Sequence, residues 1–327
     1  MKDYSFQEKF VSKPAEEFDF KEIIYEKNPD KWTAKVTINR PHVYNAYSTE
    51  TLREMSEAFL DASWDDGVGV VILTGAGDKA FCTGGDVKEY QSIFTQRPRD
   101  YWKWMALFVE AHDRFRNIGK PTIARINGIV AGGGNEWNMA CDLAIAADHA
   151  TIRQVGTRVG SVAAGGATQW LPILVGDRRA REILFLNEPI PANKALDWGL
   201  VNEVVPYEKL DNAVDIMAEK LVSKFPECAR YTKEQVNFWK NFAWDQTINH
   251  AKEWLTLHYA SWEPYEGMTA FVEKRQPDYK LIREKARDGG SSEFLWGPPG
   301  KECTNCNVKG LPALFTHCGS CGTQLGD

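Results

Sequence analysis

The regular exchange of short apolar runs and longer amphipathic stretches constrains the fold of this chain more than any other feature of its sequence. Residues 33–39 alternate apolar and polar side chains, which predicts a half-buried strand. Residues 70–73 form a continuous apolar run, typical of a buried strand. Two further strands are expected at residues 122–126 and 143–147.

Helices are expected between and after these strands. Ser48 is a suitable cap for a helix with Leu52, Met55 and Phe59 on one face. Other helical stretches are predicted over residues 101–115, from near Asn135, from Leu210 onward and over 250–286. Strands that alternate with helices predict an α/β core followed by a helical region.

Changes in composition along the 327 residues suggest how the domains are organised. The N-terminal stretch is polar with scattered aromatic residues, which predicts an irregular arm. A stretch rich in Gly, Ser and Pro (DGGSSEFLWGPPG) predicts a linker. The predicted parts are an arm at 1–20, a core at 21–225, a helical region at 226–287, a linker at 288–300 and a cysteine-rich segment at 301–327.

Charge and hydropathy exclude several classes of protein. The formal charge of -6 argues against nucleic acid as a partner, because phosphate binding relies on clustered Lys and Arg. The N-terminus has mixed charge without an apolar segment, and no apolar run approaches the length of a bilayer span. We therefore expect a cytoplasmic protein with no membrane partner.

Four of the seven cysteines form two C-x-x-C pairs, Cys303 with Cys306 and Cys318 with Cys321. This spacing predicts a zinc ribbon in which four thiolates surround one structural zinc ion. A redox dithiol is the main alternative. The segment is too short for a hydrophobic core, so the metal would supply its folding energy, and contact with a protein partner is a role to consider for it.

Two glycine-containing turns, each after an expected strand, carry the chemical interpretation. They span residues 80–89 (AFCTGGDVKE) and 127–136 (NGIVAGGGNE). Glycine lets backbone N–H groups approach a ligand closely, and the second turn opens a helix whose N-terminus favours negative charge. Two such amides aimed at one oxygen would form an oxyanion hole for a thioester enolate. Tight turns without a ligand are the alternative.

Taken together, the two turns and other segments resemble the crotonase (enoyl-CoA hydratase/isomerase) superfamily over roughly residues 20–280. The resemblance implies a ββα spiral core with a C-terminal helical region that builds a homotrimer or hexamer. It also implies an acyl-CoA thioester substrate and an oxyanion hole formed by the amides of Gly85 and Gly133. The matching segments are Asn39-Arg40-Pro41 with Asn45-Ala46, residues 81–89, 132–142 (GGGNEWNMACD), 154–171 and 195–201, and Glu266-Gly267-Met268 running to Lys274-Arg275.

The resemblance also assigns catalytic and binding residues. Hydratases of this family use two glutamates; Glu136 matches the first, whereas Gly156 stands where the second is expected. That departure puts a two-carboxylate mechanism in doubt, and Tyr44, Tyr47 and Tyr90 are candidates for a replacing hydroxyl. The predicted substrate-binding residues are Tyr44, Ala46, Asp86, Lys88, Gly132, Trp137, Gly156, Gly160 and Lys274.

Within the superfamily, the chain looks closest to the 6-oxocyclohex-1-ene-1-carbonyl-CoA hydrolases, through the segments 44–49, 80–85 and 160–168. We therefore expect water addition to an alicyclic conjugated enoyl-CoA, with hydrolytic ring opening as a further step. A simple hydratase or isomerase, or an enzyme similar to dihydroxynaphthoyl-CoA synthase that forms a carbon–carbon bond, is the alternative. A non-catalytic scaffold that recruits a partner through the ribbon is the competing class.

Overall fold

The computed structural model describes residues 10–95, 97–290 and 299–326. The described chain forms two compact units, one of residues 10–86, 102–157 and 162–253, the other of 87–101, 158–161 and 254–326. Residues 1–9 of the expected arm and 291–298 of the expected linker lie outside the described residues. Within the arm, Ala15–Glu17 form a turn of 3₁₀-helix.

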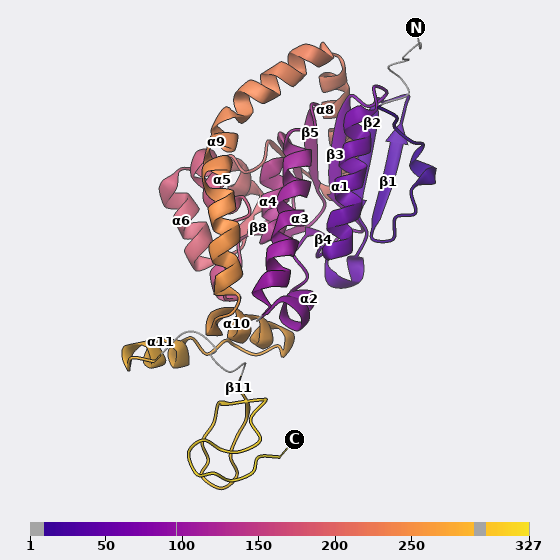
Figure 1. Cartoon of the computed structure of the whole chain (residues 1–327). Helices are drawn as coiled ribbons and strands as arrows, with labels where there is room; N and C mark the ends of the chain where they lie inside the picture. Colours follow the sequence, from indigo (N-terminus) through magenta and orange to yellow (C-terminus); the bar gives the residue numbers. More distant parts are fainter. Residues whose placement is uncertain (1–9, 96, 291–298, 327) are drawn as a thin grey trace. The chain divides into compact units, whose positions relative to one another are not determined.

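The first unit is built on a six-stranded sheet (Figure 1). Its first two strands pair in antiparallel fashion, and every later neighbour is parallel. In spatial order the strands are β1 (Ile23–Asn28), β2 (Thr33–Ile38), β3 (Val70–Gly75), β5 (Thr122–Ile126), β7 (Leu143–Ala147) and β10 (Glu203–Val205).

The strands of a second, smaller sheet alternate in sequence with strands of the first sheet. It contains, in order, β4 (Ala80–Cys82), β6 (Ile129–Ala131), β8 (Thr151–Arg153) and β9 (Ile190–Pro191), the last antiparallel to β8. Each of β3, β5 and β7 in the large sheet is followed directly by a strand of the small one. This repeated pair of strands, closed by helices, is the spiral that the resemblance implies.

Helices cover the sheets. In the first unit α8 (Leu210–Val222) packs Leu210, Val214 and Ala218 against β3, β5 and β7. The other helices wholly in this unit are α1 (Thr49–Trp64), α4 (Gly133–Ala140), α5 (Ala167–Val175), α6 (Asp177–Leu186) and α7 (Ala192–Asp197), while α3 (Pro98–Arg116) and α9 (Pro226–His258) each extend into the second. Short helical turns are Pro41–Val43, Gly156–Arg158 and Tyr207–Lys209.

Several predicted elements are confirmed, and the predicted burial of one strand is wrong. β5 and β7 have the predicted bounds, and the Ser48 hydroxyl accepts hydrogen bonds from the amides of Glu50 and Thr51, as expected for a cap. β2 was expected to be half-buried, but both faces are covered and only Lys35 is partly exposed. The reason is its interior position between β1 and β3, beside α1.

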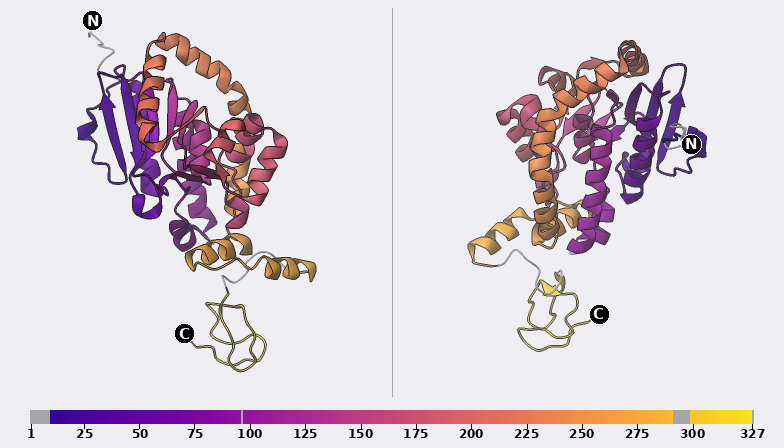
Figure 2. Two further views of the ribbon diagram at one scale, coloured as in Figure 1. Left: turned by 180° about the vertical axis from the view of Figure 1, so that it is seen from behind. Right: turned by 45° about the horizontal axis from the view of Figure 1, so that its top comes forward.

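The C-terminal part is helical, as predicted. Figure 2 shows from two sides that α9 is bent. Two lysines of α9 bind the core: Lys233 Nζ donates to Asp142 Oδ2 at 2.8 Å, and Lys240 Nζ donates to the carbonyl of Met139 at 2.7 Å. The expected boundary at residues 225 and 226 falls at the start of α9, yet most of this helix belongs to the first unit.

The second unit contains short helices and the cysteine-rich segment. Tyr90, Tyr101 and Tyr259 form an aromatic cluster in which the rings of Tyr101 and Tyr259 stack at 3.6 Å. Its elements are α2 (Val87–Glu89), a π-helical turn (Tyr90–Phe94), α10 (Trp262–Val272), α11 (Tyr279–Arg287), β11 (Pro299–Lys301) and β12 (Leu311–Pro312).

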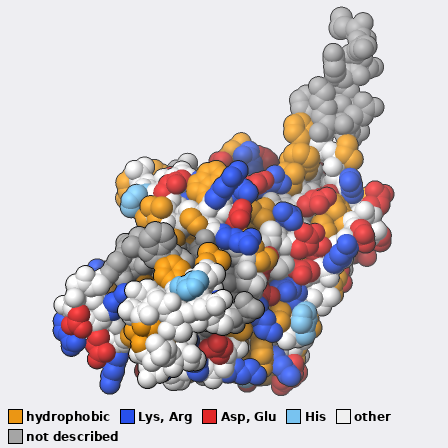
Figure 3. Space-filling model, turned by 60° about the horizontal axis from the view of Figure 1, so that its bottom comes forward, with side chains coloured by type: hydrophobic (Ala, Val, Ile, Leu, Met, Phe, Trp, Pro, Cys, Tyr) orange, Lys and Arg blue, Asp and Glu red, His pale blue; other side chains and the backbone are white. Residues whose placement is uncertain are grey.

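Surface charge is mixed. On the face drawn in Figure 3, Lys and Arg side chains lie among Asp and Glu side chains. Among the described helices, none combines the length and apolar character that a membrane span requires.

Two buried asparagines fix the loop between β3 and β4, which leads into the first glycine turn. Asn127 donates from Nδ2 to the carbonyls of Gly77 at 2.7 Å and Ala80 at 3.0 Å. Asn45 donates from Nδ2 to Ala80 at 2.7 Å as well. Because backbone carbonyls need hydrogen-bond donors, these side-chain amides hold the loop in place.

We predict that Asn127→Ala lowers the free energy of unfolding by about 2–4 kcal/mol, because it removes these bonds together with those that Asn127 Oδ1 accepts from the Thr74 hydroxyl and the Gly75 amide. Urea denaturation of the full chain measures the change. The matched control is Asn212→Ala on the exposed face of α8, which should change stability by less than about 0.5 kcal/mol. Equal stability of the two variants would contradict this role for Asn127.

Candidate active site and metal site

The two glycine turns predicted from sequence meet in the first unit. A Cβ built on Gly84 would lie 3.0 Å from the amide nitrogen of Gly133, and the φ angle of Gly84 is +93°. Any other residue at position 84 would therefore be strained and would cover that amide. The two turns approach each other so closely because glycine stands at this point.

The amides of Gly85 and Gly133 remain available to a ligand. Within residues 10–95, 97–290 and 299–326, neither N–H donates a hydrogen bond to the protein. Gly133 is the first residue of α4, where helical N–H groups lack an internal acceptor. Two such amides, in turns that approach each other closely, can bind a single developing oxyanion.

A neighbouring segment fastens the first turn. The Tyr47 amide donates to the Gly84 carbonyl at 2.9 Å, and the Asp86 amide donates to the Tyr47 carbonyl at 2.9 Å. Arg40 links the neighbouring segment to the first turn, since its guanidinium donates to the carbonyl of Ala46 and lies 3.0 Å from Asp86 Oδ2. Sequence reasoning gave Arg40 no role, although it belongs to the matching segment that includes Pro41.

Glu136 lies one turn into α4 and is buried. Its carboxylate accepts a hydrogen bond from the Ala167 amide at 3.4 Å and another from the Gly165 amide. Burial raises its pKa from the ordinary value to about 7, although the two amides act in the opposite direction. A carboxyl group with such a pKa can both accept and donate a proton near neutral pH.

An aromatic ring lies near this carboxylate. A Cβ on Gly165 would lie 2.5 Å from the Phe108 ring and 2.8 Å from Glu136 Oε2, so glycine here lets the ring and the carboxylate lie close together. Phe108 also stacks on Trp104 at 5.5 Å, and Tyr47 stacks on Trp104 at 6.4 Å. Trp104 is buried and thus belongs to an aromatic stack with Tyr47 and Phe108.

The other predicted site residues of this unit have varied environments. Tyr44 is half exposed, and Ala46 is buried. Gly132 caps α4 with a φ of +53°. Gly156 begins a 3₁₀ turn and contributes no side chain.

Trp137 lies in the core. It is fully buried against Phe59, Phe115 and His112, with His112 stacked on it at 3.7 Å. The substrate-binding role of Trp137 stays a prediction. Lys88, Gly160 and Lys274 belong to the second unit, and their binding roles stay predictions.

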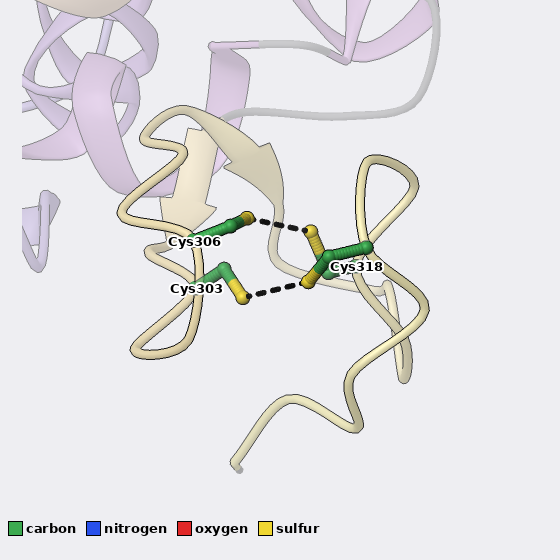
Figure 4. A group of neighbouring side chains, drawn as sticks. Cys303, Cys306 and Cys318 are labelled. Carbon is green, nitrogen blue, oxygen red and sulfur yellow. Dashed lines mark hydrogen bonds between the residues drawn. The ribbon is translucent and has the colours of Figure 1, made fainter.

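The four C-terminal cysteines converge on one point, as Figure 4 shows for the three that it labels. Their sulfur atoms lie within 4.8 Å of one another, with 3.5 Å between Cys303 and Cys321 and between Cys306 and Cys318. Zinc–sulfur bonds of about 2.3 Å in a tetrahedron place ligands about 3.8 Å apart. The donor set and its spacing therefore fit a zinc ion.

The backbone at each cysteine pair forms the same kind of hydrogen-bonded turn. The amide of Asn307 donates to the Cys303 carbonyl, and that of Gly322 donates to the Cys318 carbonyl, both at 2.8 Å. Asn307 and Gly322 each have a positive φ angle. The accompanying apolar cluster holds Leu311 and Leu325, too little to stabilise the segment without a metal.

Comparison with known proteins agrees with this geometry. The sequence profile described as "Enoyl-CoA hydratase/isomerase" matches residues 30–281. The chain therefore belongs to the enoyl-CoA hydratase/isomerase family, in the crotonase superfamily. Its core has that α/β fold with a C-terminal helical region.

Solved structures support the same assignment. An enoyl-CoA hydratase from Bacillus anthracis is 32% identical, with a TM-score of 0.63 over 80% of this chain and 99% of the other. An enoyl-CoA hydratase/isomerase from Xanthobacter autotrophicus Py2 is 29% identical, with a TM-score of 0.69 over 83% and 94%. An enoyl-CoA hydratase from Mycobacterium avium subsp. paratuberculosis K-10 is 25% identical, with a TM-score of 0.71 over 79% and 98%. The cysteine-rich segment lies beyond the matched residues 30–281.

We predict that the purified chain carries about one zinc ion, as a four-thiolate site requires. Replacing Cys303 and Cys318 by Ser should abolish zinc binding, measured by atomic emission, because each pair then loses a ligand. Cys228→Ser, at an exposed cysteine on α9, is the matched control and should keep the metal. Zinc retained by the double variant would show that the ligands lie elsewhere.

Proposed function

We propose that this protein adds water to a conjugated enoyl-CoA thioester whose acyl group is alicyclic. The single observation that carries the proposal is a buried Glu136, with a pKa raised to about 7, one helical turn beyond the free amide of Gly133. The thioester oxygen would lie between the amides of Gly85 and Gly133. Zinc would have a structural role in the separate cysteine-rich segment, because four thiolates leave no open coordination position.

In this proposal Glu136 moves the protons. As a carboxylate it accepts a proton from the water that attacks the β-carbon, and the electrons pass to the thioester oxygen as an enolate. The two amides stabilise that negative charge, which is larger than in the bound substrate. Gly156 offers no second carboxylate, so Glu136 then returns a proton to the α-carbon.

The alicyclic acyl group is supported by the aromatic stack of Tyr47, Trp104 and Phe108. Flat, rigid rings suit a cyclic apolar ligand better than polar side chains do. The family membership supports a linear enoyl-CoA equally well, and this simple hydratase is the second candidate. Hydrolytic ring opening after water addition is the further step of the leading proposal.

We also propose that the chain self-associates through α9, as a homotrimer or hexamer. Within residues 236–242 of this helix, four large apolar side chains are more than half exposed in the single chain: Val236, Phe238, Trp239 and Phe242. Such a contiguous apolar surface is costly in water and typical of a subunit interface.

We predict that Glu136→Gln lowers kcat by about 10²–10⁴-fold while acyl-CoA binding persists, because an amide cannot exchange protons as a carboxylate does. Turnover is followed with a conjugated enoyl-CoA and binding with a saturated acyl-CoA. Glu188→Gln, at an exposed glutamate after α6, is the matched control and should behave as wild type. Unchanged kcat in the Glu136 variant would remove this residue from the mechanism.

The pH profile tests the same residue in the wild-type protein. Because water activation needs the carboxylate, kcat/KM should rise as pH increases through about 7, the raised pKa of Glu136. The residual activity of Glu136→Gln should lack this step. A wild-type midpoint near the ordinary glutamate pKa of about 4.3 would contradict the buried environment.

A further inference from the structure

Tyr47 lies against the backbone of Gly133. A Cβ built on Gly133 would overlap the Tyr47 hydroxyl oxygen and would lie 2.9 Å from Cζ and 3.0 Å from Cε1 of the ring. That position is one bond from the Gly133 Cα and two bonds from its amide nitrogen. The phenol group is therefore beside the free amide that begins α4.

The position of this ring is fixed on several sides. Its backbone is paired with the Gly84–Asp86 turn through the two hydrogen bonds described above. The ring is 2% exposed, stacks on Trp104 at 6.4 Å and lies 6.2 Å from Phe108. A side chain held in this way cannot turn its hydroxyl elsewhere without disturbing the stack, so the hydroxyl is preorganised next to the turns.

Resting on the function proposed above, we propose that the Tyr47 hydroxyl is a third donor for the oxyanion, beside the amides of Gly85 and Gly133. A phenol group can donate one hydrogen bond. The acceptor is the thioester oxygen, which gains negative charge as the enolate forms. The hydroxyl bonds more strongly to that enolate than to the neutral thioester, so Tyr47 lowers the barrier rather than only improving binding.

The presence of glycine at position 156, where a second glutamate is expected, explains why a third hydrogen-bond donor would help the reaction. Without a second carboxylate to supply a proton at the α-carbon, the enolate must persist until Glu136 returns its proton. An extra hydrogen bond to the enolate oxygen compensates for that delay. A bulky aromatic residue at position 47 also explains why position 133 must be glycine, since any Cβ there would overlap the hydroxyl.

Tyr47→Phe tests the proposal in the full chain, because it keeps the ring and removes only the hydroxyl. We expect kcat to fall by about 10²-fold, the loss typical of one oxyanion donor. The Kd of a saturated acyl-CoA should change by less than about threefold, since that ligand makes no enolate. Binding of acetoacetyl-CoA as its enolate, followed by the enolate's ultraviolet absorbance, should weaken in parallel with kcat.

The matched control is Tyr25→Phe, which removes another buried hydroxyl that donates to Asp61 Oδ2 at 2.7 Å, apart from the glycine turns. It should lose stability but keep kcat and enolate binding. Retention of both quantities in Tyr47→Phe, or equal weakening of the saturated and enolate ligands, would overturn the role of Tyr47. If the wild-type chain turns over no enoyl-CoA, the proposed function fails, and enolate binding alone still decides whether Tyr47 is a donor.

Discussion

The close approach of two backbone turns is the constraint on which the rest of this site depends. The Gly84 turn and the Gly133 turn come from segments about fifty residues apart along the chain, each after a strand of the small sheet. Parallel pairing of β4 with β6 brings them to the same edge. Glycine at position 84 leaves the Gly133 amide uncovered, and the bonds from Tyr47, Asp86 and Arg40 prevent the first turn from drifting.

The chemistry that this arrangement supports follows from burial. Glu136 lies among Phe108, Gly165 and the start of α5, where water is scarce and the charged carboxylate is costly. The same low polarity strengthens every hydrogen bond to an oxyanion. One environment thus prepares a neutral-range acid–base group and a strong oxyanion site together.

Sequence alone predicted the elements that carry a strong local signal. Strand β5 is rich in apolar residues and β7 is a continuous apolar run, and the cap of α1 is a serine at the expected place. The four cysteines were predicted as one cluster because a fixed spacing of soft ligands has few other uses, and their sulfur atoms do converge. The two glycine turns were likewise identified through their order after strands.

Other features depend on contacts between distant residues and leave little local trace. Strand β1 was not predicted because Ile24 points to solvent and disturbs its alternation. Glu54 of α1 holds the start of that strand in place. Its carboxylate accepts hydrogen bonds from three successive amides, those of Lys21, Glu22 and Ile23. The position of Tyr47 over Gly133, and that of Trp137 in the core, follow from how helices α3 and α4 pack rather than from any motif.

The most direct test of the account is a product analysis by mass spectrometry, with the full chain in isotopically labelled water. Linear, alicyclic and aromatic acyl-CoA thioesters are offered separately, and each is also tested for binding. The account predicts that a conjugated alicyclic enoyl-CoA gains one labelled oxygen from water at the highest rate, with loss of this product in Glu136→Gln. Binding of these thioesters without incorporation of labelled water into any of them would contradict it.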